Sequence, residues 1–79
     1  MPRYPAVALA AQLEGDVHLR VTIGADGRIG EVVVERSANP VFNGAAIEAV
    51  RRSEYRPGRR NGVPAELSTT TTVRFSLAR

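Results

Sequence analysis

The sequence contains no cysteine and no lysine, and it has a single histidine. The lack of cysteine excludes both a disulfide framework and a thiolate metal site. No apolar run approaches the roughly 18–20 residues that a membrane-spanning helix requires, and the first residues lack the apolar segment of a signal peptide. All eleven basic residues are arginines and eight acidic residues offset them, so the net charge of +3 permits nucleic-acid binding without favouring it.

The chain has the size and composition of one small domain. Its 79 residues are 43% apolar and 24% charged, which is ordinary for a soluble globular protein. A domain of this size buries only about 60–65% of the surface that its unfolded chain exposes. We therefore predict a single domain over residues 1–79 with a narrow margin of stability.

The first half of the chain predicts a short helix and a β-hairpin. Residues 6–13 follow Pro5, which suits the first position of a helix, and Gly15 is the expected end of that helix. Asp26-Gly27 supplies the positive-φ residues of a tight turn, and a second strand is expected over residues 29–37. Before the turn, four apolar residues alternate with polar ones at the period of a half-buried strand: Val17, Leu19, Val21 and Ile23.

The second half predicts another helix and a long strand. Asn43 is a good N-cap residue, and Pro57-Gly58 should end the helix. After a loop that turns at Asn61-Gly62, residues 66–77 form a third strand, in which four consecutive β-branched threonines favour an extended backbone. The order helix, strand, strand, helix, strand, without an internal repeat, indicates an α+β domain.

The third strand should lie at an edge of the sheet. The first two strands form a hairpin and are neighbours, so the third can only lie beside one of them. Natural edges are commonly protected by charge, proline or shortness. The second strand carries Glu31, Glu35 and Arg36, whereas the interior of the third carries Arg74 as its one charge and no proline. Either a helix, a tail or a neighbouring molecule covers this edge, or it accepts an extended peptide through main-chain hydrogen bonds.

Seven short motifs follow one another in a fixed order over nearly the whole chain. The first half contains PRYP, the strand and turn of LEGDVHLRVTIGADGRI, and ERS after the second strand. The second half contains AAIEAVRRSEYRPG, NGVP and VRFSL. In this order they resemble the C-terminal domain of the TonB energy-transducer family.

The resemblance implies a fold and a partner. In that family the first strand is central, which gives strand order 2-1-3 in a small antiparallel three-stranded sheet with two helices packed on one face. The domain would lie in the periplasm of a Gram-negative bacterium and bind the TonB box of outer-membrane receptors by β-strand addition. It would transmit mechanical energy from the proton-driven ExbB–ExbD motor of the inner membrane for the uptake of nutrients such as siderophores or vitamins.

The resemblance also assigns residues by position. The docking strand would supply the partner-binding residues, with Thr70 and Thr72 facing outward: Ser68, Thr69, Thr70, Thr71, Thr72, Val73 and Arg74. The family uses residues just before its Y-P motif for receptor contact, and the basic loop can attract acidic partners. These two segments give the secondary contact candidates: Arg3, Tyr4, Arg56, Arg59 and Arg60.

Two features depart from the family pattern. The anchor helix and the proline-rich linker are absent from these 79 residues, and only Met1–Arg3 precede the Y-P motif. An exposed edge in such a shortened chain would also permit a homodimer by strand exchange. Ser53 stands where many relatives have tryptophan, and Tyr55 is expected to compensate for the missing ring.

The arginine-rich stretch leaves alternatives open. Five of the eleven arginines lie between Arg51 and Arg60, where they would complement a helix end and solvate a loop, or attract acidic partners. They could also form a small basic nucleic-acid-binding α+β module, but only Tyr55 offers a stacking ring nearby, so nucleic acid is not the expected partner. A TolA-like cell-envelope interaction domain is a third possibility.

Catalytic and metal chemistry find little support in the sequence. His18 has no second histidine or cysteine with which to bind a metal, and a solvated side chain is expected. Ser37, His18 and Asp26 supply the residue types of a hydrolytic triad, but nothing in the pattern brings them together. We therefore predict neither an enzyme nor a cofactor.

Overall fold

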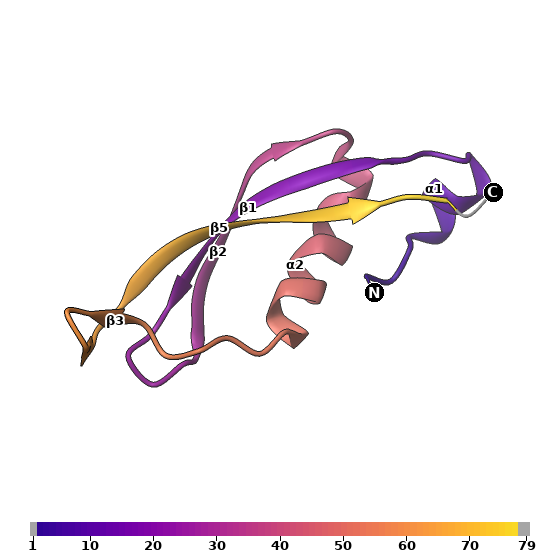
Figure 1. Cartoon of the computed structure of the whole chain (residues 1–79). Coiled ribbons are helices and arrows are strands. Elements are labelled where there is room, and N and C mark those ends of the chain that lie inside the picture. The colour runs from indigo at the N-terminus through magenta and orange to yellow at the C-terminus, as the bar shows by residue number, and fades with distance from the viewer. Residues whose placement is uncertain (1, 78–79) are drawn as a thin grey trace.

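A three-stranded antiparallel sheet runs along the molecule, and a helix lies on one of its faces (Figure 1). The computed structural model describes residues 2–77. Its elements are α1 (Ala6–Ala10), β1 (Gly15–Ile23), β2 (Ile29–Ser37), the 3-10 helix η1 (Pro40–Phe42), α2 (Asn43–Arg52), β3 (Arg59–Arg60), β4 (Val63–Pro64) and β5 (Leu67–Phe75). The predicted α+β class is confirmed.

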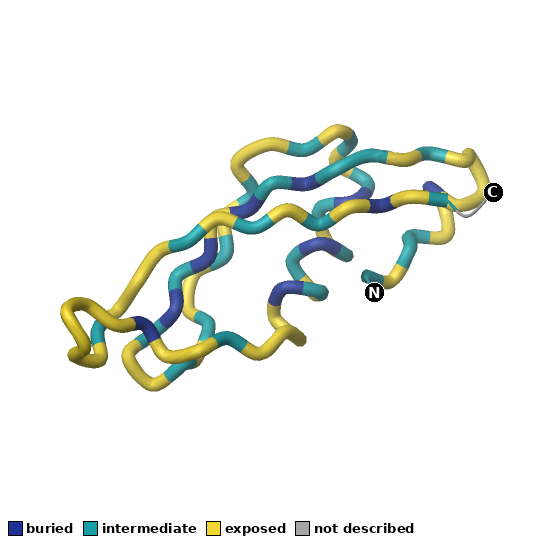
Figure 2. The backbone as a smooth tube through the Cα atoms, viewed as in Figure 1, coloured by how far each residue is buried: buried dark blue, intermediate teal, exposed yellow. Residues whose placement is uncertain are grey.

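The sheet order is β2-β1-β5, with antiparallel neighbours. This confirms the order 2-1-3 that the resemblance implied and makes β1 the central strand. The helix α2 supplies Ala46 and Val50 to the core under the sheet. The alternating apolar residues of β1 are all buried in this core (Figure 2): Val17, Leu19, Val21 and Ile23. The period of two in the sequence therefore predicted the inward face of β1 correctly.

Three aromatic rings join the N-terminal segment to the sheet. Phe42 and Phe75 stack with their ring centroids 4.4 Å apart. Tyr4 meets both rings edge-on, at 5.9 Å from Phe42 and 5.6 Å from Phe75. The Tyr4 hydroxyl donates a hydrogen bond to the carbonyl oxygen of Leu13, so the polar end of the ring is also satisfied. This aromatic cluster holds residues 2–5 against the core.

The helix α2 begins differently from the prediction. Asn43 is already helical, with φ −59° and ψ −48°, so it is not the N-cap residue. The chain enters α2 through η1, and the side chain of Asn39 accepts a hydrogen bond from the N–H of Val41 at 3.0 Å. Asn39 therefore caps the 3-10 turn. The prediction at Asn43 was wrong because this turn precedes the helix without a break.

Both helices also end earlier than predicted. The helix α1 ends at Ala10, and Gln12 adopts a left-handed backbone with φ 55°. Gly15 therefore does not close α1 and instead begins β1. The helix α2 ends at Arg52, several residues before Pro57-Gly58, because the backbone of Ser53 is extended. No helix within residues 2–77 has the length and apolar character needed to cross a membrane.

The two predicted turns are present, with one correction. In the β1–β2 turn only Gly27 has a positive φ, of 85°. Asp26 contributes its carboxylate instead, which accepts a hydrogen bond from the N–H of Arg28 at 3.0 Å. Asn61-Gly62 has φ values of 53° and 79° and closes a small β3–β4 hairpin that the sequence pattern did not predict.

Gly58 is buried where three segments meet. Its N–H donates to the carbonyl oxygen of Gly24 at 3.2 Å, and its own carbonyl accepts from the N–H of Ala65 at 2.8 Å. A Cβ atom at this position would lie 2.2 Å from the carbonyl oxygen of Ala65, which is backbone and cannot rotate away. We expect Gly58→Ala to lower the free energy of unfolding by about 2–3 kcal/mol.

Urea denaturation followed by circular dichroism measures this effect. Gly44→Ala is the matched control, because a Cβ atom at Gly44 in α2 would meet nothing within 4 Å. The control should be neutral or slightly stabilising, since alanine is the better helix former. Equal unfolding midpoints for the two variants would contradict the close approach at Gly58.

Candidate functional site: the free edge of β5

The two edge strands of the sheet, β2 and β5, differ in regularity. β5 pairs with β1 without interruption, from Leu67 opposite Ile23 to Phe75 opposite Gly15. β2 has two register irregularities against β1, and its charged side chains are exposed. Bulges and charges protect an edge, whereas a long regular edge accepts another strand. Within residues 2–77 no strand pairs with the outer side of β5. The strand itself is shorter than the predicted range 66–77.

The hydrogen-bond pattern identifies the main-chain groups of β5 that face the open edge. The N–H of Ala38 donates to the carbonyl oxygen of Asp16 at 3.0 Å, so even-numbered residues of β1 bond to β2 and odd-numbered residues bond to β5. Val17 therefore exchanges main-chain bonds with Val73, which lies opposite it. Because the alternation repeats every two residues, the outward N–H and C=O groups belong to every second residue of β5: Ser68, Thr70, Thr72 and Arg74.

The seven predicted partner-binding residues all lie within β5 and alternate between its two faces. Ser68, Thr70, Thr72 and Arg74 are exposed. The residues between them are half-buried on the helix side: Thr69, Thr71 and Val73. Thr70 and Thr72 were predicted to face outward, and their exposure in β5 agrees with that prediction. Contact of the seven residues with a partner stays a prediction.

Side chains of β1 and β5 pair across the exposed face of the sheet. His18 Nδ1 lies 2.9 Å from Thr72 Oγ1, and Arg74 Nε donates to Asp16 Oδ1 at 3.2 Å. These contacts orient the edge side chains and are made by side chains alone, so they do not involve the outward main-chain groups. In the described part of the chain no three His, Cys, Asp or Glu side chains gather where they could hold a metal ion.

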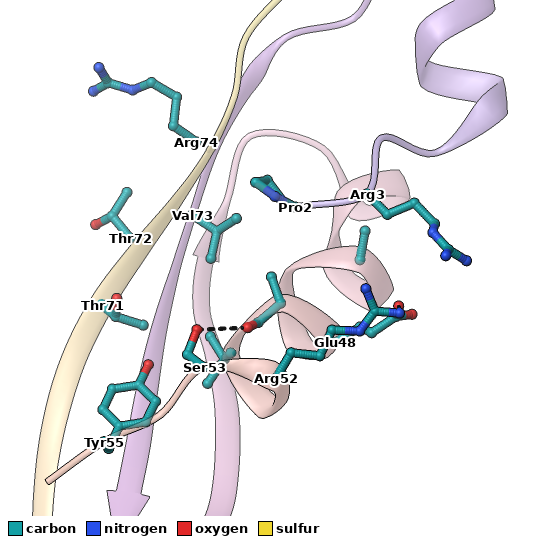
Figure 3. Close-up of a pocket in the computed structure, with 13 residues that line it drawn as sticks. Pro2, Arg3, Glu48, Arg52, Ser53, Tyr55, Thr71, Thr72, Val73 and Arg74 are labelled. Atoms are coloured by element: carbon teal, nitrogen blue, oxygen red, sulfur yellow. Dashed lines mark hydrogen bonds and ion pairs between the residues drawn. The ribbon is translucent and has the colours of Figure 1, made fainter.

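A groove of about 480 Å³ lies beside this edge, between β5 and α2 (Figure 3). The helix packs mainly over β2 and β1, which leaves its β5 side open. Thr71–Arg74 form one wall, α2 and Tyr55 form the other, and residues 2–3 lie at one end. This groove was not predicted from the sequence. Its one signal was the spacing of the small residues Ala45, Ala49 and Ser53, which lie on one face of a helix.

The five secondary contact candidates lie in different places. Arg3 is exposed and lines the groove. Tyr4 is half-buried in the aromatic cluster, so the structure gives it a packing role, and its contact with a partner stays a prediction. Arg56, Arg59 and Arg60 are exposed in or just before β3, at the end of the molecule opposite α1 (Figure 1).

The arginines of the stretch 51–60 do not form one basic surface. Arg51 and Arg52 belong to α2, where Arg51 donates to the carbonyl oxygen of Gly30 at 3.3 Å. Arg52 pairs with Glu48, as its i, i+4 spacing predicted. Arg59 lies on the distant hairpin and donates to its own turn. A phosphate-binding surface requires several cations on one face, and this arrangement separates the two arginines of α2 from those in or just before β3.

Comparison with known proteins shows the family of the chain. The family model described as Gram-negative bacterial TonB protein C-terminal matches residues 1–77. Protein TonB of Xanthomonas campestris pv. campestris (strain B100) is 34% identical over 77 residues, which are 96% of this chain and 34% of that protein. Protein tonB2 of Pseudomonas aeruginosa is 32% identical over 77 residues, 96% of this chain and 28% of that protein.

A further relative shows similar partial coverage. Protein TonB of Escherichia coli (strain K12) is 38% identical over 60 residues, 73% of this chain and 25% of that protein. The chain thus spans about a third or less of the length of these curated relatives. The family model covers both the central hairpin and the edge strand described above. The chain therefore belongs to the family of Gram-negative bacterial TonB C-terminal domains.

Proposed function

We propose that the free edge of β5 binds an extended peptide as an additional strand of the sheet. The observation that carries the proposal is the uninterrupted register of β5, whose outer side pairs with no strand of residues 2–77. Each outward main-chain group can form one hydrogen bond, worth about 1 kcal/mol net. Part of this gain offsets the ordering of the peptide, so we expect about micromolar affinity or weaker.

Family membership suggests the identity of the peptide and the role of the domain. We propose that the peptide is the TonB box of an outer-membrane receptor and that the domain is a non-enzymatic adaptor in the periplasm. Through an inner-membrane anchor it would work with the ExbB–ExbD motor and pass on mechanical energy for nutrient uptake. This rests on the match of residues 1–77 to the TonB C-terminal family and on relatives named TonB.

An NMR titration of the ¹⁵N-labelled domain tests the proposal. The domain is titrated with a TonB-box peptide and, in parallel, with a short single-stranded oligonucleotide. We expect the peptide to shift the amides of residues 66–77 at both low and high salt. Main-chain pairing depends little on salt, whereas phosphate binding weakens steeply as salt rises.

N-methylated peptides supply the matched control. An added strand directs every second amide toward β5. Methylation of that set should abolish the shifts, while methylation of the alternate set should preserve them. Equal effects of the two sets would contradict strand addition. Shifts at residues 51–60 with the oligonucleotide alone would support the nucleic-acid module instead.

A further inference from the structure

We infer that the groove between β5 and α2 selects a bulky apolar side chain on the strand that binds to β5. This inference rests on the proposed function, because the strand must dock at the edge before its side chain can enter the groove. It adds a specificity that main-chain pairing alone cannot supply, since every peptide has the same main chain.

The geometry of an added strand directs side chains into the groove. Such a strand lies about 4.8 Å from β5, and its successive side chains point to opposite faces of the sheet. The set on the helix side shares a face with Thr71 and Val73, and both of these residues line the groove. A peptide residue opposite either one therefore enters the space between β5 and α2 (Figure 3).

The groove offers an apolar occupant a buried floor next to β5. Its floor includes Val50, which is 2% exposed. Val73 and Tyr55 pack against the core and present their remaining surface to the groove. Ala49 and Ser53 are small, so the helix wall leaves room. Arg3, Glu48 and Arg52 also line the groove, and Arg52 pairs with Glu48. The volume of about 480 Å³ lies within the range of pockets that enclose small ligands, roughly 300–1,000 Å³.

The opposite face of an added strand offers no such apolar floor. There the neighbouring side chains of β5 are exposed hydroxyls and an arginine that is already paired with Asp16. A hollow of about 360 Å³ near the start of the strand is lined by Arg20, Ser68 and Thr70 of this face, together with Thr69 between the last two. Selection of apolar side chains should therefore fall on alternate peptide positions.

Calorimetric titration with two designed peptides tests this inference. Both are capped peptides of alternating threonine and valine with acidic ends for solubility, and they differ in one central valine position, which is replaced by phenylalanine or alanine. We expect the phenylalanine peptide to bind about tenfold more tightly to the wild-type domain. Ser53→Trp should fill the groove and remove this difference, whereas Ser53→Ala should retain it.

The possible outcomes separate the two proposals. Equal affinity of the wild-type domain for both peptides would overturn the groove inference and leave strand addition intact. A preference that persists in Ser53→Trp would also overturn it, because the side chain would then bind elsewhere. Failure of both peptides to bind would contradict strand addition itself. If Ser53→Trp does not fold, Ala49→Leu replaces it in this test, because leucine at this position narrows the groove from the helix side.

Discussion

Thr72→Pro should weaken binding of an added strand about thirtyfold or more while the domain stays folded. The N–H of Thr72 points to the open edge, so proline removes a donor from the docking strand without breaking a bond to β1. Its ring would also project toward the incoming main chain. Proline is tolerated at outward positions of an edge strand, and the lost contact with His18 is on the exposed face. Calorimetry gives the affinity, and an amide spectrum reports the fold.

Two neighbouring variants make this prediction specific. Thr72→Ala keeps the N–H and should bind almost as well as the wild-type domain. Thr71→Pro removes a donor that bonds to β1, so it should destabilise the domain by about 3 kcal/mol. If Thr72→Pro binds the peptide with unchanged affinity, the edge of β5 is not the docking site.

Phe42→Ala should lower the free energy of unfolding by about 3–5 kcal/mol. Phe42 is fully buried, stacks on Phe75 and makes a T-shaped contact with Tyr4, so its removal leaves a cavity at the junction of three segments. Small domains have a total stability of only about 5 kcal/mol at the low end. A large fraction of the Phe42→Ala protein should therefore be unfolded at ambient temperature, which thermal and urea unfolding will measure.

Matched variants distinguish the contribution of the aromatic cluster to stability from the effect of removing any apolar side chain. Val63 is 63% exposed on the β3–β4 hairpin, and Val63→Ala should change stability by less than about 0.5 kcal/mol. Phe42→Leu keeps most of the apolar volume, so it should lower the free energy of unfolding clearly less than Phe42→Ala does. A loss below about 1 kcal/mol for Phe42→Ala would show that the aromatic cluster does not hold the fold together.

The strands were predictable because their pattern depends directly on burial. A strand with one buried face must alternate, and the sequence showed this from Val17 to Ile23. The edge position of β5 followed from the hairpin alone. The pattern did not predict which strand pairs with β5. The order 2-1-3 was predicted from the resemblance to the family.

The helix ends and the small hairpin were not predicted from the sequence pattern, and the reasons are local. Asn39 and Asn43 are equally suitable caps by residue type, and a 3-10 turn too short to show a period decides between them. β3 and β4 have two residues each, which is too few for alternation to be visible. Gly58 looked like a helix terminator, whereas its actual role is a close approach to Ala65.

The groove was not predicted because it depends on how two elements are placed relative to each other. The sequence identified the docking strand and the helix separately. Their separation depends on where α2 lies, and the helix packs mainly over β2 and β1. Ser53, which stands where many relatives have tryptophan, lines the groove next to the edge.

The arrangement of the N-terminal segment and β5 has a mechanical consequence. Residues 2–5 and the end of β5 at Phe75 lie away from the β3–β4 hairpin in a molecule 46 Å long, and Tyr4 links the two by a ring contact with Phe75 (Figure 1). Under a load applied through residues 2–5, a bound strand that continues toward the hairpin is pulled along its length, and its hydrogen bonds share the load in shear. A strand that continues toward α1 is peeled away one bond at a time. The same contacts, with the same affinity at rest, would therefore resist force in one pulling direction and yield in the other.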